Sequence, residues 1–178
     1  MAQLFLESEA AEEKRKMNKK TKQLLFFLLR IFTVAAFVFL ILTFIVTPRL
    51  VRGNNMYPSL KDGQLVLIFR PGRVLKDSIV LYRDLEGEEK IGRVIGEAAD
   101  VVEIQDESGI LLNENLLIRR IPYPVPAGDL DYPYHIPEES FFLVNDYRED
   151  TEDSRSFGAV SKEKIVGVVV FALQYRDF

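Results

Sequence analysis

The central segment of this sequence reads Gly53-Asn54-Asn55-Met56-Tyr57-Pro58-Ser59-Leu60-Lys61-Asp62-Gly63 and begins seven residues after a long apolar run. The proline favours extended backbone at Tyr57, and the pair Asp62-Gly63 is typical of a turn. An alternating apolar run, Leu65–Phe69, follows directly and predicts a strand. The segment is therefore predicted to be a loop that leads into a β-strand.

The apolar run before this loop extends from Leu24 to Val46 and contains one charge, Arg30. As a helix it would span roughly 34 Å, enough for a hydrocarbon core of roughly 30 Å. A cleaved signal peptide is the alternative, but the run is long for one and no small-x-small site follows it. We expect an uncleaved anchor. The basic residues on its N-terminal side are Lys14, Arg15, Lys16, Lys19, Lys20 and Lys22.

This charge distribution predicts a topology, because basic residues favour the cytoplasmic side of a membrane. We expect residues 1–23 to be a cytoplasmic segment, residues 24–46 a single transmembrane helix and residues 47–178 an extracellular domain of the cell membrane. The sequence leaves open whether translation starts at Met1 or Met17.

Beyond the anchor the apolar residues change to a period of two, with turn pairs such as Pro71-Gly72 between short runs. No sustained helical period follows, which argues against βαβ units and predicts a mainly β domain. The predicted strands are Leu65–Phe69, Ser78–Tyr82, Gly92–Ile95, Val101–Ile104, Ile110–Leu112, Phe141–Val144 and Ile165–Leu173.

The composition argues against several kinds of site. The chain has no cysteine and one histidine, His135, so we expect no disulfide, no metal site, no cofactor and no Ser-His-Asp triad. Residues 47–178 contain 16 basic and 23 acidic residues, which makes this part acidic by seven. An acidic domain repels phosphate backbones, so nucleic acid is not an expected partner.

The central loop resembles the nucleophile loop of type I signal peptidases, written G-x-S-M-x-P-T-L-x-x-G-D in that family. Met56, Pro58, Leu60 and Gly63 fall in register. The resemblance implies that Asn55 occupies the position of the nucleophilic serine. An amide does not act as a nucleophile in covalent catalysis of this kind.

A second segment, residues 89–96, resembles the family motif Y-I-K-R-V-I-G, whose lysine is the general base. The resemblance implies that Gly92 stands in place of that lysine. Glycine has no group that can accept a proton. We therefore expect a catalytically inactive homologue, which is not an enzyme, with degenerate dyad positions at Asn55 and Gly92.

Two further segments carry the resemblance, and they imply a signal-peptidase-like β-barrel or sandwich. Residues 76–82 resemble R-G-D-I-V-x-F, and residues 145–158 are similar to G-D-N-R-x-N-S-x-D-S-R-x-x-G. In that family such residues mainly hold the framework of the active site through charge pairs. The framework positions are Arg93, Asp146, Arg148, Asp153, Ser154, Arg155 and Gly158.

Homologues of this type occur in Gram-positive pilus loci, as the SipA or LepA type, and assist sortase-dependent pilin polymerisation. The resemblance implies a chaperone or accessory factor that binds an extended pilin or sortase segment by strand addition. We expect the cleft between the loop 53–60 and the strand 76–82. Its candidate residues are Gly53, Asn54, Asn55, Met56, Pro58, Ser78, Ile79, Lys90 and Gly92.

Two alternatives stay open. One is an active signal peptidase that uses displaced groups, namely Lys90 with Ser59 or Ser78, since Lys90 lies about 6.6 Å from position 92 on the same strand face. The other is a structural module that binds through its Pro- and Tyr-rich segment, residues 122–137. The sequence leaves open the identity of the partner and whether the chain is a monomer or a homo-oligomer.

Overall fold

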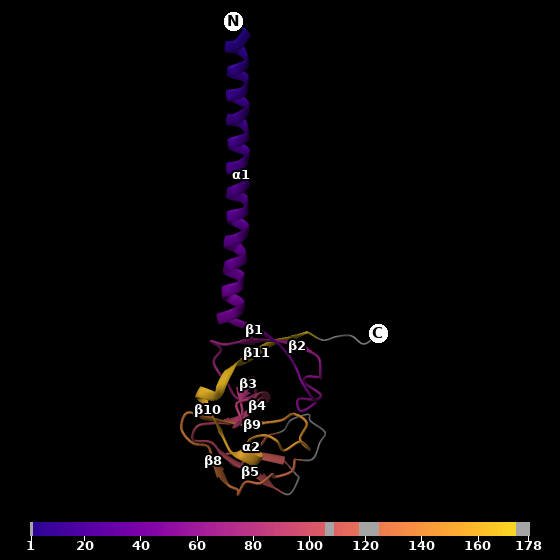
Figure 1. The fold of residues 1–178 in the computed structure, drawn as a ribbon. Coiled ribbons are helices and arrows are strands. Elements are labelled where there is room, and N and C mark those ends of the chain that lie inside the picture. Colours follow the sequence, from indigo (N-terminus) through magenta and orange to yellow (C-terminus); the bar gives the residue numbers. More distant parts are fainter. Residues whose placement is uncertain (1, 106–108, 118–124, 174–178) are drawn as a thin grey trace. The chain divides into compact units, whose positions relative to one another are not determined.

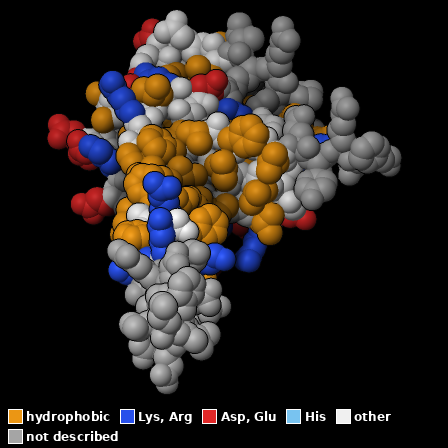
Figure 2. All heavy atoms as spheres, turned by 90° about the horizontal axis from the view of Figure 1, so that it is seen from above, with side chains coloured by type: hydrophobic (Ala, Val, Ile, Leu, Met, Phe, Trp, Pro, Cys, Tyr) orange, Lys and Arg blue, Asp and Glu red, His pale blue; other side chains and the backbone are white. Residues whose placement is uncertain are grey.

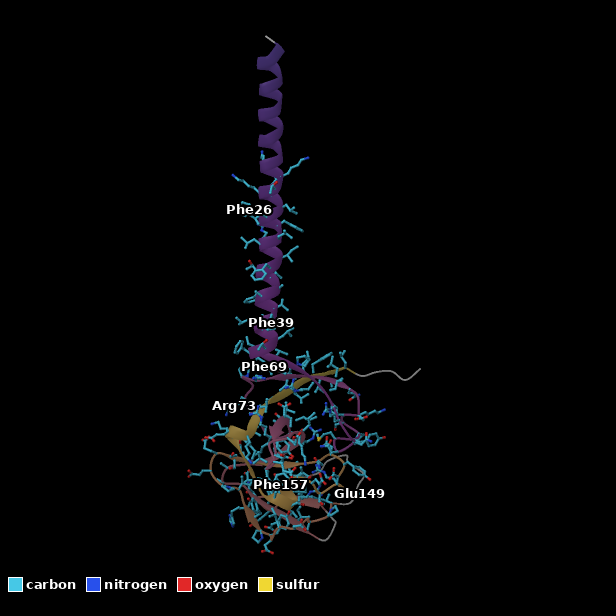
Figure 3. All side chains as sticks on the ribbon, in the orientation of Figure 1. Phe26, Phe39, Phe69, Arg73, Glu149 and Phe157 are labelled. Carbon is cyan, nitrogen blue, oxygen red and sulfur yellow. The ribbon has the colours of Figure 1, made fainter. Side chains whose placement is uncertain are left out.

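The computed structural model describes residues 2–105, 109–117 and 125–173, and it divides the chain into the compact units Met1–Thr43 and Phe44–Phe178 (Figure 1). The first unit consists of α1 (Ala2–Phe44). Its segment Lys19–Phe44 is long and apolar enough to cross a membrane. Apolar side chains along this segment, among them Phe26 and Phe39, are exposed (Figure 3).

The second unit is mainly β, as predicted, and its larger sheet is antiparallel throughout, in the order β1-β2-β11-β3-β4-β9-β10. In that order the strands are β1 (Val46–Leu50), β2 (Leu65–Phe69), β11 (Ile165–Leu173), β3 (Ile79–Arg83), β4 (Glu89–Glu97), β9 (Ser140–Val144) and β10 (Val160–Ser161).

A smaller antiparallel sheet has the order β7-β6-β5-β8. Two short helices, α2 (Ser154–Phe157) and the 3₁₀ turn η1 (Lys162–Lys164), lie before and after β10 in the sequence. The strands of the smaller sheet are β7 (Asn115–Leu116), β6 (Gly109–Leu112), β5 (Val101–Gln105) and β8 (Tyr134–His135).

The seven predicted strands are all present, and β2 and β11 have the predicted bounds. The short strands β7, β8 and β10 and the strand β1 were missed. β1 contains Pro48, which is tolerated because β1 is the edge strand of its sheet. β1 also follows the apolar span directly, and the predicted span 24–46 ended at Val46, the first residue of β1.

The core forms three clusters, and β4 contributes to each of them. Ile91 packs with Met56 on one side of the strand, whereas Val94 packs with Tyr82, and Ile95 packs with residues of the smaller sheet. A Cβ on Gly96 would lie 2.6 Å from Ile136 Cδ1. Glycine at this position therefore lets the two sheets approach, and β4 links the parts of the domain.

Candidate functional site: a groove beside Asn55

A groove with a volume of about 890 Å³ lies beside Asn55. One wall is formed by β1 and the loop after it, and the other by residues 87–91, which include the first residues of β4. The lining residues are Pro48, Arg49, Leu50, Arg52, Gly53, Asn54, Asn55, Leu65, Leu81, Gly87, Glu88, Glu89, Lys90, Ile91, Asn145, Asp150 and Glu152.

Asn55 joins three segments of the domain. Its Nδ2 donates to the carbonyl of Ile91 at 2.9 Å and to Oδ1 of Asn145 at 3.2 Å. Its carbonyl accepts from the amide of Tyr147 at 2.9 Å. The loop, β4 and the segment after β9 therefore meet at this asparagine.

The rest of the loop is shaped by local contacts. Met56 is fully buried and Leu60 nearly so, and both pack under the loop. The amide of Gly53 donates to Oδ1 of Asp62 at 2.7 Å, and Gly53 has a φ of +78°, which favours glycine. These contacts hold the wall of the groove in place from beneath.

Gly92 is buried on the opposite side of β4 from Ile91 and does not line the groove. A Cβ on Gly92 would lie 3.2 Å from Cε1 of Tyr82 and 3.4 Å from Cβ of Leu143. Burial, with the charges of Asp153 and Asp84, raises the pKa of Tyr82 above its ordinary value. The tyrosine ring thus takes up space that glycine at position 92 would leave.

Lys90 lies on the same face of β4 and forms ion pairs with two carboxylates. Its Nζ is 3.3 Å from Oδ2 of Asp84 and 3.5 Å from Oε2 of Glu152. Burial lowers the pKa of Lys90, but the hydrogen bond to Asp84 and the two negative charges outweigh burial and raise the pKa. Lys90 is therefore held protonated, the opposite of what a general base requires.

The two serines considered as partners of Lys90 form other hydrogen bonds. Oγ of Ser59 accepts from Nη2 of Arg93 at 2.9 Å. The main chain of Ser78 bonds to Leu75 and Val94. Within the described part of the chain, no hydrogen bond joins Lys90 to either serine.

Arg93 ties β4 to the loops around it. Its Nε donates to Oδ1 of Asp146 at 2.7 Å, and its Nη2 also pairs with this carboxylate. Nη1 donates to the carbonyl of Asp77 at 2.9 Å, in the turn before β3. One guanidinium thus connects the central loop, the turn before β3 and the segment after β9.

Arg155 is a second, fully buried hub. Its Nε donates to Oδ1 of Asp153 at 2.9 Å, and its Nη1 donates to the carbonyl of Arg148 at 2.7 Å. Nη2 donates to the carbonyl of Asp150, and Oδ2 of Asp153 accepts from the amide of Asn145 at 2.8 Å. These bonds fix the segment that supplies Asn145 and Asp150 to the groove.

Helix α2 begins at this hub. Asp153 caps it by accepting from the amide of Arg155 at 2.9 Å. Oγ of Ser154 accepts from the amide of Leu143 at 3.0 Å, which ties the helix to β9. Gly158 ends the helix with a φ of +85°. Asp153, Ser154 and Gly158 therefore each have a distinct structural role at this helix.

The structure brings part of the predicted cleft together. Gly53, Asn54, Asn55 and Lys90 line the groove, whereas Met56, Pro58, Ser78, Ile79 and Gly92 are not among its lining residues. The opposite wall is mainly the start of β4, which faces Asn55 directly, and the predicted strand 76–82 contributes Leu81 to the lining.

Sequence reasoning missed the groove residues of β1 and of the turn before β4. Arg49 and Glu89 form an ion pair of 2.8 Å between the two walls, from positions 40 residues apart. The alternation from Val46 to Leu50 is the signal that would have revealed β1. Glu88 and Glu152 also line the groove, and no pattern in the sequence marks them.

The Pro- and Tyr-rich segment lies elsewhere. Of its residues 122–137, residues 122–124 are outside the described part of the chain. Val125, Leu130, Tyr132 and Tyr134 pack against the core of the smaller sheet. Among the described residues, no group of three or more His, Cys, Asp or Glu side chains is placed to hold a metal ion.

The family model described as signal peptidase, peptidase S26, matches residues 24–174. Signal peptidase IB of Staphylococcus aureus (strain Mu50) is 28% identical over 175 residues, which cover 84% of this chain and 89% of that protein. Signal peptidase I of Bacillus licheniformis is 27% identical over 177 residues, which cover 89% and 92%.

The solved structure of a signal peptidase I from Enterococcus faecalis V583 superposes with a TM-score of 0.48 at 20% identity and covers 56% of this chain and 98% of that one. The predicted signal-peptidase-like β fold with one apolar N-terminal helix is confirmed by the family match and by the sheets described above. The prediction that the chain is not an enzyme is wrong, because its relatives are named as signal peptidases. That prediction depended on positions 55 and 92 alone, whereas the similarity extends over most of the chain.

Proposed function

Since the chain belongs to the signal peptidase family, peptidase S26, we propose that its β domain binds an extended polypeptide segment in the groove beside Asn55. The observation that carries this proposal is the pairing of β4. β4 pairs with β3 from Glu89 to Arg93, but it pairs with β9 only from Arg93 onward. Among the described residues, residues 89–92 therefore have no strand on one edge.

This edge faces the groove, because the carbonyl of Ile91 accepts from Asn55 across it. An unpaired strand edge presents main-chain donors and acceptors to an added strand. Four residues of extended peptide cover about 13 Å, which matches the length of the unpaired part of β4. Recognition of this kind uses the main chain, so it accepts segments of different sequence.

The resemblance to pilus-assembly proteins supplies the partner in this proposal. The bound segment belongs to a pilin or to a sortase, and the chain acts as an accessory factor in sortase-dependent pilus assembly. The helix α1 is a single-pass, uncleaved anchor with residues 1–23 in the cytoplasm and residues 47–178 outside. The exposed apolar segment Lys19–Phe44 and the basic residues before it support this arrangement.

The test is a titration of the full chain in detergent with extended peptides taken from pilins and sortases. We expect N-methylation of alternate peptide amides, those that face β4, to weaken binding at least tenfold. Methylation shifted by one residue is the matched control and leaves the affinity unchanged, because those amides point away from the strand. Equal effects of the two methylation patterns would refute strand addition.

A variant of the groove provides a second test. Asn54→Trp places an indole in the groove, and we expect it to abolish binding. Glu138→Trp adds the same group at an exposed position that does not line the groove. Binding that survives Asn54→Trp unchanged would place the peptide on another surface.

Hydrolysis of signal peptides is a second candidate function, which the names of the relatives favour. Lys90 is not the base in this candidate, since it is paired with Asp84 and Glu152. The same peptide mixtures, analysed by mass spectrometry for cleavage products, distinguish binding from hydrolysis. The double variant Asn55→Ser, Gly92→Lys, which supplies a hydroxyl and an amine, is the positive comparison for cleavage.

A further inference from the structure

The basic and acidic residues of the β domain are separated along the chain. Residues 45–76, which directly follow the apolar span, contain six Lys or Arg and one acidic residue. Residues 77–178 contain 10 basic and 22 acidic residues. The part of the domain nearest to the span in sequence is therefore positive, although the domain as a whole is negative.

Two of the six basic side chains are neutralised within the domain. Arg49 pairs with Glu89 at 2.8 Å, and Lys76 pairs with Asp100 at 2.8 Å. The other four are exposed, and none forms an ion pair with a carboxylate in the part of the chain that the structure describes. These four are Arg52, Lys61, Arg70 and Arg73.

Arg70 is held close to the end of the apolar span by two bonds. Its amide donates to the carbonyl of Ile45 at 3.0 Å, and its Nε donates to Oγ1 of Thr47 at 3.0 Å. The span ends at Phe44, and three extended residues reach about 11 Å at most. Arg70 is therefore bonded to residues that lie within three positions of the end of the apolar span.

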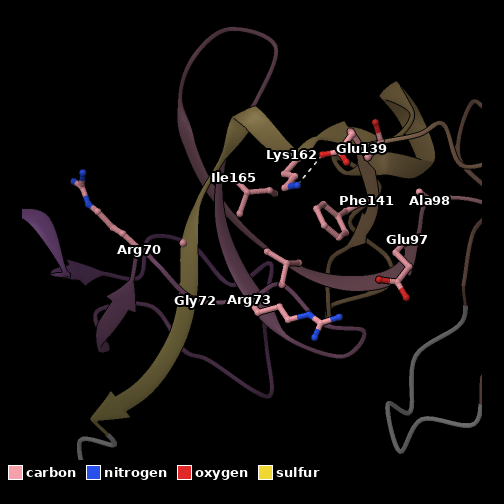
Figure 4. A pocket seen from close by; sticks show the side chains of 12 residues that line it. Arg70, Gly72, Arg73, Glu97, Ala98, Glu139, Phe141, Lys162 and Ile165 are labelled. Carbon is pink, nitrogen blue, oxygen red and sulfur yellow. Dashed lines mark hydrogen bonds and ion pairs between the residues drawn. The ribbon is translucent and has the colours of Figure 1, made fainter.

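Arg73 borders a hollow with a volume of about 600 Å³. Figure 4 shows that the side chains of Arg70 and Arg73 extend to opposite sides of Gly72. A Cβ on Gly72 would lie 3.0 Å from the carbonyl oxygen of Phe69, so the turn between the two arginines is tight. The lining of the hollow includes the apolar side chains of Val74, Phe141 and Ile165.

The hollow is lined by three basic residues, Arg70, Arg73 and Lys162, and by two acidic residues, Glu97 and Glu139, so its rim carries a net positive charge. Nζ of Lys162 is 2.8 Å from Oε2 of Glu139, so the charges of these two side chains offset each other. Arg73 has no such partner among the described residues. Hydrophobic side chains and charged side chains of both signs are visible in Figure 2. Exposed apolar residues lie on the two strands that pair with β2, namely Leu50 on β1 and Phe171 on β11.

We propose that Arg70 and Arg73 bind the phosphate groups of anionic phospholipids in the membrane that α1 spans. A guanidinium binds phosphate oxygens through two parallel N–H bonds, which an ammonium does not. Because the two side chains point away from each other, each arginine takes its own headgroup. The inference depends on α1 being an uncleaved anchor. The bound headgroups hold the basic part of the domain against the membrane and leave the acidic part in solution.

The test uses the full chain in nanodiscs and reads amide hydrogen exchange of the segment 69–76. Because this measurement reports on residues 69–76 alone, it is separate from the attraction of anionic lipids by the lysines before the span. We expect slower exchange in discs that contain phosphatidylglycerol than in discs of phosphatidylcholine alone. Soluble glycerol phosphate, added to phosphatidylcholine discs, should give no slowing, and slowing in that arm would overturn the lipid assignment in favour of a free phosphate site.

Variants test whether the slower exchange depends on Arg70 and Arg73. Each surface arginine contributes about fivefold to the attraction of an anionic membrane. Arg73→Ala should therefore reduce the slowing about fivefold, and Arg70→Ala, Arg73→Ala together should abolish it. Arg83→Ala removes the same charge from an exposed position outside this turn and should leave the slowing unchanged. Equal effects of Arg73→Ala and Arg83→Ala would overturn the proposal, as would identical exchange in the two lipids.

Discussion

The side-chain nitrogen of Asn55 lies 2.9 Å from the carbonyl oxygen of Ile91 and donates a hydrogen bond to it. The same nitrogen donates to Asn145 at 3.2 Å. Asn55 thus joins both walls and one end of the groove, which a serine hydroxyl with one proton would not do. The residue at this position determines how firmly the groove is held in shape.

Replacement of Asn55 by alanine should lower the free energy of unfolding by about 1–2 kcal/mol, because two hydrogen bonds of a partly buried side chain are lost. Chemical denaturation of the full chain in detergent measures this change. Asn54→Ala is the matched control. Its side chain is exposed, and the substitution should change the free energy of unfolding by less than about 0.5 kcal/mol. Similar losses for the two variants would contradict the joining role of Asn55.

Two glycines of β4 should respond differently to alanine. A Cβ on Gly92 would meet the ring of Tyr82 at 3.2 Å, which a slight movement of the ring relieves. A Cβ on Gly96 would meet Ile136 at 2.6 Å and Leu112 at 3.0 Å, where the two sheets approach. We expect Gly96→Ala to cost about 1–3 kcal/mol of stability and Gly92→Ala less than about 1 kcal/mol. A greater loss at position 92 would show that Tyr82 cannot move.

The sequence predicted most strands because their periods of two are local signals. β2 alternates buried and half-buried residues from Leu65 to Phe69, and its bounds were predicted correctly. The groove was predicted only in part, since its second wall depends on how β4 pairs. The unpaired edge of residues 89–92 follows from β9 starting its pairing at Arg93, which no local pattern reveals. The pair formed by Arg49 and Glu89 is likewise a product of the folded sheet.

Replacement of a buried charged residue should lower the stability of this domain more than replacement of an exposed one. Arg155 is fully buried and uses its guanidinium for Asp153 and for several carbonyls. Arg155→Lys keeps the charge but loses most of these bonds, so we expect a loss of about 3–5 kcal/mol. Lys162→Ala breaks an exposed pair with Glu139 and should cost less than about 1 kcal/mol. Thermal and chemical unfolding of both variants give this comparison, and a small loss for Arg155→Lys would count against the hub.

The pair of Lys90 and Asp84 should make stability depend on pH at both ends of the scale. Burial raises the pKa of Asp84, but hydrogen bonds from the amides of Glu88 and Glu86 and from Lys90 outweigh it, so the pKa of Asp84 is lowered. The stabilisation that ionised Asp84 gives to the folded state is complete above the unfolded carboxyl pKa of about 4. It is lost as the pH falls through the lower pKa of the folded state. The pKa of Lys90 is raised, so its effect on stability depends on pH in the opposite direction. The stabilisation from protonated Lys90 is complete below the unfolded pKa of about 10.4 and is lost as the pH rises through the higher folded pKa.

Lys90→Met removes the ammonium and keeps much of the stem, so it breaks the ion pairs of Lys90 with Asp84 and Glu152. The difference in unfolding free energy between the wild type and Lys90→Met should be greatest between about pH 5 and pH 9 and should shrink below about pH 4. Urea denaturation across a pH series measures the difference. Arg83→Met, an exposed neutralisation on β3, should give a small difference that does not vary over the same range. If the difference for Lys90→Met stays constant down to about pH 3, Lys90 does not lower the pKa of Asp84.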